Sequence, residues 1–164
     1  MAELTNLESK LGEVTGLAMA AQVATATVQK LAEEEDESLV ATLQTMAEEA
    51  ARTEERCTEL AGTFEGKKTA ILDEARTVKQ KGAEMMKIYL DEDSDALDGF
   101  EFLCMAESGE VGHWGVLQQL NENAGHGGLG ELIEWALPIQ QRHLRDVLDG
   151  AKTLAAEEDP NEAA

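Results

Sequence analysis

Apolar side chains recur every three or four residues along four long segments of this chain, and no other feature restricts its fold as strongly. That spacing places them on one side of an α-helix, where neighbouring helices must cover the resulting hydrophobic stripe. The pattern predicts helices near residues 5–32, 38–64, 95–122 and 128–156. We therefore expect an all-α protein, built as a bundle of four antiparallel helices.

The overall composition favours the same architecture. Hydrophobic residues make up 43% of the 164 residues, aromatic residues only 4%, and there are two prolines. This length suits one domain with a substantial core, which we place at residues 1–156. Residues 157–164 are acidic and lack the stripe, so we expect a disordered tail.

Several residues are suited to start or stop these helices. Thr5-x-x-Glu8 has the form of a capping box at the first helix start. Further candidates are Asp36 or Ser38 for the second start, Gly66 for its stop, and Ser94 for the third start. Pro138 lies inside the fourth pattern, where it predicts a kink or a restart.

Residues 67–90 separate the second and third segments and hold most of the lysines. Their amphipathic pattern is weaker, and it predicts one or two shorter helices. A connection of this length can carry the chain back along the bundle, which a short loop cannot do. We therefore interpret these residues as a long helical crossover.

The charge balance argues against two classes of partner. With 34 acidic and 13 basic residues the net charge is −21, which disfavours nucleic acids and anionic membranes. No apolar run is long enough to span a membrane, and the N-terminus does not resemble a signal peptide. Cys57 and Cys104 stand alone, as is typical of a reducing compartment, so we expect a cytoplasmic protein.

Two glutamates interrupt the stripe of the third predicted helix. Its members are Phe100, Leu103, Glu107, Glu110, Trp114, Leu117 and Asn121. An unpartnered carboxylate on a core-facing line is costly, so these two require protonation, a cationic partner or a metal ion. Glu110-x-x-His113 adds an imidazole one turn further on.

The fourth predicted helix offers partners at the same depth. The turn between the last two helices is centred near Gly125, and the pair Glu107/Glu110 lies as far before it as Gln140/His143 lies after it. In an antiparallel hairpin these four side chains should meet, with His113 at the rim. His126, in the glycine-rich turn, is expected to face solvent.

Three interpretations of this cluster compete. Converging carboxylates and a neutral imidazole are ligands for a transition metal. The same residues could form a buried Glu–His pair with Gln140 as hydrogen-bond partner. A shifted helix phase would instead leave both glutamates in solvent.

At the level of families, the chain resembles the ferritin-like superfamily. The closest resemblance is to the small bacterial stress-related ferritin-like proteins, whose third helix carries a segment of the form V-E-H-Y-E-I-A-x-Y-G. Ala106 to Gly115, AESGEVGHWG, is similar to it and keeps both glutamates, an aliphatic residue, an aromatic residue and the last glycine. The resemblance implies an antiparallel ferritin-like four-helix bundle with a long crossover between its second and third helices.

The resemblance also implies a metal site, with ligands from all four helices. This chain has Ala21 next to Gln22, Arg52 and Arg56, and Ile139 and Gln140 where the family offers further ligands. The set is therefore incomplete for a di-iron centre. The candidate metal residues are Glu107, Glu110, His113, Gln140 and His143, with iron or another divalent transition metal as the cofactor.

Two functions follow from these observations. The first is a ferritin-like metal-binding protein with a redox or stress-protective role. The second is a structural or interaction bundle that has lost its metal. Small residues at Ala18–Ala26 and at Gly109, Gly112 and Gly115 further predict helix faces suited to a homo-oligomer.

Overall fold

The computed structural model describes residues 2–163, which form five α-helices and no strand. The helices are α1 (Asn6–Leu31), α2 (Glu37–Ala61), α3 (Lys68–Tyr89), α4 (Ala96–Ala124) and α5 (Gly127–Ala155). The prediction of an all-α chain is confirmed, and the four predicted helices begin and end within three residues of α1, α2, α4 and α5. Within residues 2–163, no helix is long and apolar enough to cross a membrane.

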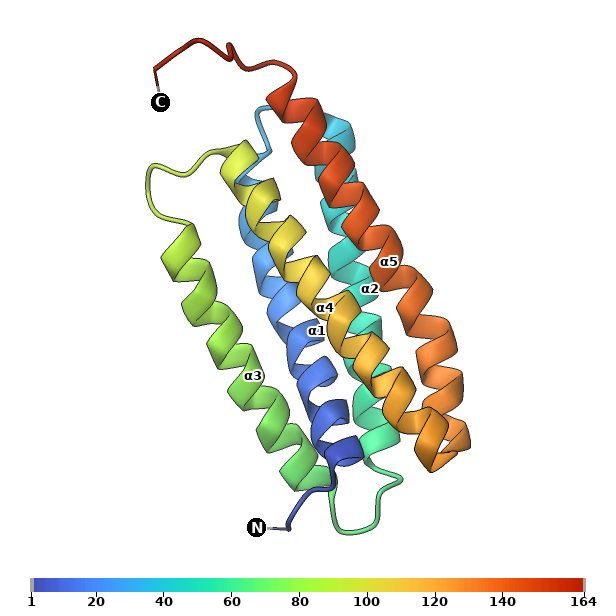
Figure 1. Cartoon of the computed structure of the whole chain (residues 1–164). Helices are drawn as coiled ribbons and strands as arrows, with labels where there is room; N and C mark the ends of the chain where they lie inside the picture. Colours follow the sequence, from blue (N-terminus) through green and yellow to red (C-terminus); the bar gives the residue numbers. More distant parts are fainter. Residues whose placement is uncertain (1, 164) are drawn as a thin grey trace.

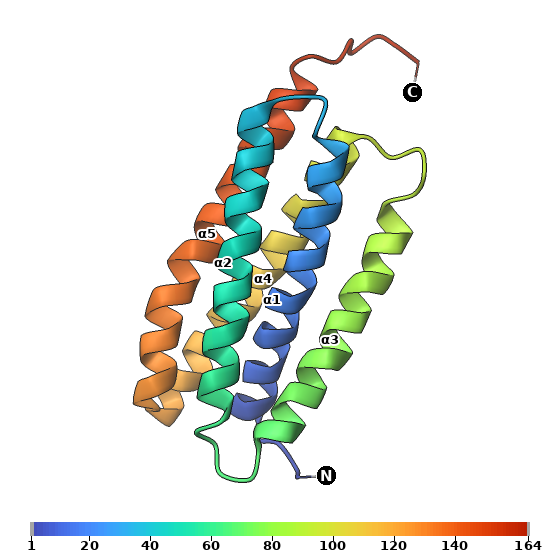
Figure 2. The same cartoon turned by 180° about the vertical axis from the view of Figure 1, so that it is seen from behind.

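The five helices lie side by side with alternating chain direction (Figures 1 and 2). Helices α2 and α4 run the same way, so the chain between them must return along the bundle. Helix α3 makes this return as a single helix of 22 residues, which accounts for the predicted crossover. It packs along the outer side of α1 (Figure 2).

Some of the predicted capping residues are confirmed and others are wrong. Thr5 and Glu8 form the predicted capping box, and Asp36 caps α2 through the Ser38 amide. Helix α2 stops at Ala61 rather than near Gly66, which adopts a left-handed conformation in the following loop. Asp95, not Ser94, caps α4, because its carboxylate accepts from the Asp98 amide.

Two other expectations about α5 are corrected. The helix continues through Pro138, so a restart there is wrong, while a kink stays a prediction. His126 is half-buried rather than solvent-exposed: its Nδ1 accepts from the Leu129 amide at 3.1 Å, and its ring stacks on Phe64 with centroids 4.9 Å apart. The imidazole therefore caps α5 and helps to close the turn that begins at Gly125.

The apolar core is divided into two parts along the bundle. One contains Leu43, Met46, Phe100, Leu103 and Val147, among others. The other contains Leu11, Ile71, Trp114, Leu117 and Ile133, among others. Between them, on both α4 and α5, the core-facing side chains are polar.

Glycines on α1 let α3 approach closely. A Cβ atom built on Gly16 would lie 2.3 Å from the Ala75 carbonyl oxygen, and one on Gly12 would lie 2.8 Å from that of Ile71. Gly12 and Gly16, which precede the predicted small-residue face at Ala18–Ala26, therefore serve contact with α3 within the chain. The glycines of α4 differ, because a Cβ on Gly109, Gly112 or Gly115 meets nothing within 4 Å.

Replacing Gly16 by Ala tests this close approach. The added methyl group would press on the backbone of α3, so we expect unfolding to need about 1–3 kcal/mol less free energy, measured by urea denaturation. The matched control is Gly115→Ala, where space is open and better helix propensity should add up to about 1 kcal/mol. Equal effects of the two variants would contradict the tight α1–α3 contact.

Candidate functional site

Glu107 and Glu110 occupy the middle of α4 and face the core. Their exposed fractions are 1% and 3%, so the predicted helix phase holds and a solvent-facing position is wrong. Leu103 lies one turn before them and Trp114 one turn after, both buried. The two carboxyl groups are thus enclosed by apolar neighbours along their own helix.

Gln140 and His143 of α5 meet these glutamates at the same depth. The Nδ1 atom of His143 lies 3.7 Å from Oε2 of Glu107. With its amide oriented to match its neighbours, Gln140 donates to Oε2 of Glu110 at 3.0 Å and to Oε2 of Glu107 at 3.3 Å. The structure therefore brings together the four side chains that the hairpin argument paired, and we call them the core cluster.

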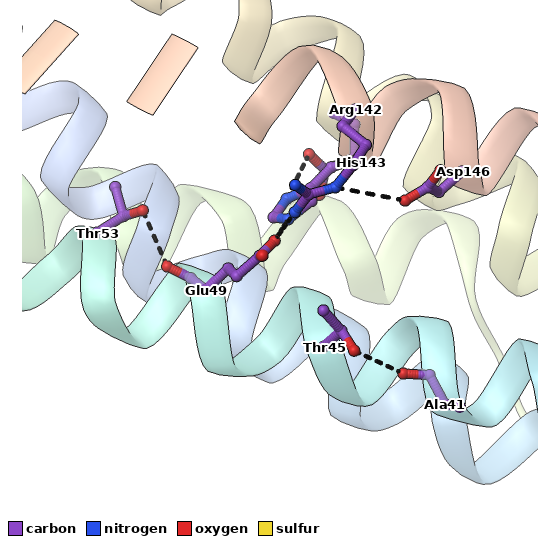
Figure 3. Close-up of polar contacts among 8 residues, drawn as sticks. Ala41, Thr45, Glu49, Thr53, Arg142, His143 and Asp146 are labelled. Carbon is purple, nitrogen blue, oxygen red and sulfur yellow. Dashed lines mark hydrogen bonds and ion pairs between the residues drawn. The ribbon is translucent and has the colours of Figure 1, made fainter. Parts of the chain in front are cut away.

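The cluster continues toward the surface through α2. Nε2 of His143 lies 2.6 Å from Oε2 of Glu49, and Arg142 contacts the same carboxylate oxygen (Figure 3). Arg142 in turn lies 3.8 Å from Asp146. A line of polar groups thus runs from the core, through one buried imidazole, to an ion pair at the α2–α5 edge.

Burial sets the protonation of these groups. It raises the pKa of Glu110 to about 8, and burial together with repulsion from Glu110 raises the pKa of Glu107 well above its usual value. Burial lowers the pKa of His143, against the opposing influence of Glu49. At neutral pH the cluster therefore consists of largely protonated carboxyl groups around a neutral imidazole.

Glu49 behaves in the opposite way. Burial works against its ionisation, but hydrogen bonds from His143 and Arg142 outweigh that penalty and lower the pKa of its carboxyl group. An ionised Glu49 can only accept hydrogen bonds, so Nε2 of His143 must carry the ring proton. Nδ1 then presents its lone pair toward Glu107.

His113 lies outside the core cluster. Its Nδ1 contacts Oε2 of Glu13 on α1 at 3.0 Å and Nζ of Lys10 at 3.3 Å, and its side chain is 41% exposed. It belongs to a surface ion-pair group between α1 and α4.

Three residues stand where the family resemblance implies further metal ligands. Gln22 points its amide at Glu54. Arg52 is exposed, and the Arg56 guanidinium lies 4.2 Å from the ring centroid of Trp135. None of the three contributes a donor atom to the core cluster.

The core cluster offers only a few atoms that could bind a cation. Over residues 2–163, no three His, Cys, Asp or Glu side chains form a ready-made metal-binding group. The core cluster instead joins two carboxyl groups, one imidazole nitrogen and an amide. Two atoms bound to one small cation at about 2.1 Å are roughly 3–3.6 Å apart. Nδ1 of His143 and Oε2 of Glu107 are 3.7 Å apart, slightly more than this range.

The cysteines take no part in this chemistry. Burial raises the pKa of the Cys57 thiol to about 12, so it packs as an unreactive apolar group. Burial also raises the pKa of Cys104, although this residue is only partly covered.

Comparison with known proteins yields no relative. No protein-family model, no curated protein and no solved structure matches the chain. The ferritin-like resemblance therefore stays a prediction from the sequence.

Glu49 is the site residue that the sequence analysis missed. It was not among the candidate residues named there. However, Glu49 lies three residues after Met46 and four before Thr53, both buried on that stripe. This spacing places it at the edge of the core-facing side, and that signal could have identified it.

The raised carboxyl pKa values make stability depend on pH. A carboxyl group with a higher pKa in the folded protein favours folding at low pH, and this contribution is lost as pH rises through about 5 to 8. We therefore expect the metal-free protein to lose stability across this range, with a slope for Glu110 of at most about 1.4 kcal/mol per pH unit. Glu110→Gln should flatten the slope.

The control for this experiment is Glu55→Gln, which removes one negative charge from an exposed position on α2. Urea denaturation at several pH values, with a chelator present, measures the free energy of unfolding of the wild type, Glu110→Gln and Glu55→Gln. A slope unchanged by Glu110→Gln would contradict the assigned protonation.

Proposed function

We propose that the protein binds one divalent transition-metal cation at the core cluster. The observation that carries this proposal is the facing pair of Nδ1 of His143 and Oε2 of Glu107, 3.7 Å apart. That separation is too long for a hydrogen bond. It is close to the separation of two ligands around a small cation.

The contact with Glu49 supports the same proposal. Histidine ligands of metals usually donate their second ring N–H to a carboxylate, which fixes the tautomer and the ring orientation. Glu49 accepts from Nε2 at 2.6 Å and is itself held by Arg142. Glu49 and Arg142 would thus act as positioning residues, while Glu107, Glu110 and His143 would bind the cation directly.

Gln140 can serve either state of the cluster. Its NH₂ group satisfies the two carboxyl groups when no cation is present. Turned by half a rotation, its carbonyl oxygen would face the same space as a fourth ligand. A cation there would also offset the cost of two ionised carboxylates in an apolar surrounding.

The proposal extends to one metal and not to a di-iron centre, because α1 supplies no carboxylate to the cluster. A transition metal in this site would supply Lewis-acid or redox chemistry. The redox or stress-protective role, and iron as the metal, come from the ferritin-like resemblance and remain predictions. So do a cytoplasmic location and a homo-oligomer.

One observation favours a second candidate, a metal-free structural or interaction bundle. The Gln140 amide alone donates to an oxygen of each glutamate, so both buried carboxyl groups have a hydrogen-bond partner without any ion. Such a network would separate the two apolar parts of the core and fix the pairing of α4 with α5.

Melting temperature with and without metal distinguishes the two functions. A cation that binds only the folded state, at about 100 times its Kd, adds about 2.7 kcal/mol, or roughly 5–10 °C. We expect iron, manganese or zinc to produce such a rise in the wild type and not in Glu107→Gln. Binding should weaken as pH falls, because protons compete for the carboxylates.

Glu101→Gln is the matched control, since Glu101 lies on the exposed side of α4. If the wild type gains nothing from any of the three metals and carries none when purified without chelators, the metal site is wrong. Glu107→Gln should then be neutral or stabilising, because a buried acid no longer needs a partner.

A further inference from the structure

A groove with a cavity of about 290 Å³ lies between α1, α3 and α4. Helix α3 stands against α1 but makes little contact with α4, so the seam between α1 and α4 remains open on this side. We call this cavity the α3 groove. Its size is at the lower end of small-molecule binding sites, and an apolar cavity of half this volume can hold benzene.

The walls of the α3 groove are small or flexible apolar residues. Its lining includes Ala20, Ala24, Gly82, Ala106 and Gly109. Val23, Met85 and Met105 stand at its opening, with exposed fractions of 44%, 45% and 37%. Methionine side chains adapt their shape readily, as is typical of surfaces that accommodate an apolar ligand.

Polarity changes along the length of the groove. Gly82 of α3 packs on Ala20 of α1, and Gly99 of α4 packs on Val28, which sets the relative height of the three helices. Lys79 and His113 therefore lie at one end, whereas Met86 and Phe102 lie at the other. The second end has no charged lining residue among those described.

The charged end favours an anion. Lys10 and His113 at this end both contact the carboxylate of Glu13. Lys79, in contrast, is exposed and forms no ion pair with residues 2–163, so it is the cation available to a ligand. Glu107 and Glu110 also border this end, but they are buried and directed toward α5. Solvent ions screen acidic groups that lie more than about 10 Å from the ligand. The charge of nearby Lys79 therefore has the larger effect on a ligand at this end.

We propose that the α3 groove binds a medium-chain aliphatic carboxylate, with its head at Lys79 and its chain directed toward Met86 and Phe102. Met86 lies seven residues after Lys79, a rise of about 10 Å along the helix, which is the length of an extended chain of roughly eight carbons. This site lies on the opposite side of the core cluster from Glu49, and it does not depend on the metal proposal.

Isothermal titration calorimetry with octanoate tests the proposal, using the full chain with a chelator present and about 0.15 M salt. Octanoate should bind one to one, at least tenfold more tightly than octylammonium. Butyrate should bind far more weakly, because each buried methylene contributes roughly fourfold in affinity. No octanoate binding at millimolar concentration, or equal binding of octylammonium, overturns the proposal.

Two pairs of variants locate the ligand. Gly109→Leu fills the groove and should abolish octanoate binding, whereas Gly115→Leu, in equally open space away from the lining, should not. Lys79→Met should weaken octanoate binding about tenfold and leave octan-1-ol binding unchanged, whereas Lys81→Met, exposed on the same helix, should change neither.

Two further outcomes would overturn the proposal. The first is octanoate binding that persists in Gly109→Leu. The second is a wild-type dimer that Gly109→Leu converts to a monomer in light scattering, which would assign the groove to a second copy of the chain. Because the chelator removes metals, these experiments do not involve the proposed cation site. Either outcome would overturn the groove proposal and leave the metal proposal unaffected.

Discussion

The arrangement of this protein depends on two carboxyl groups held in the middle of an apolar helical bundle. Glu107 and Glu110 are almost fully buried, and an unpartnered ionised carboxylate at such a depth costs several kcal/mol. Three features of the surroundings reduce that cost. Gln140 donates to both groups, burial keeps them largely protonated, and His143 stands neutral beside Glu107. The polar layer that results divides the core and ties α4 to α5.

The two sides of this layer differ in chemistry. Toward α2 and α5, the polar contacts lead through Glu49 to the Arg142–Asp146 pair, so water and ions meet charged groups there (Figure 3). Toward α1 and α3, the layer borders an apolar groove lined by alanine, glycine and methionine. A cation would thus approach from one side, and an apolar ligand from the other. The net charge of −21 favours accumulation of cations around the whole molecule.

Much of this architecture could be predicted from the sequence, because helical periodicity and hairpin symmetry are local rules. The stripe placed Glu107 and Glu110 in the core, and equal distance from Gly125 paired them with Gln140 and His143. Glu49 was missed because it comes from a helix not adjacent in sequence, and the α2–α5 register depends on packing. The approach of α3 to Gly12 and Gly16, and the groove it leaves open, are likewise tertiary features without a sequence pattern of their own.

The protonation of the His143 ring tests the central claim most directly, and long-range ¹H–¹⁵N NMR correlation of its imidazole reports it. We predict a neutral ring with the proton on Nε2, held by Glu49, and a bare Nδ1 facing Glu107. Adding zinc should move the Nδ1 resonance and leave the Nε2 proton in place. A proton on Nδ1, a doubly protonated ring at neutral pH, or a spectrum unchanged by zinc would contradict a cation site built on this residue.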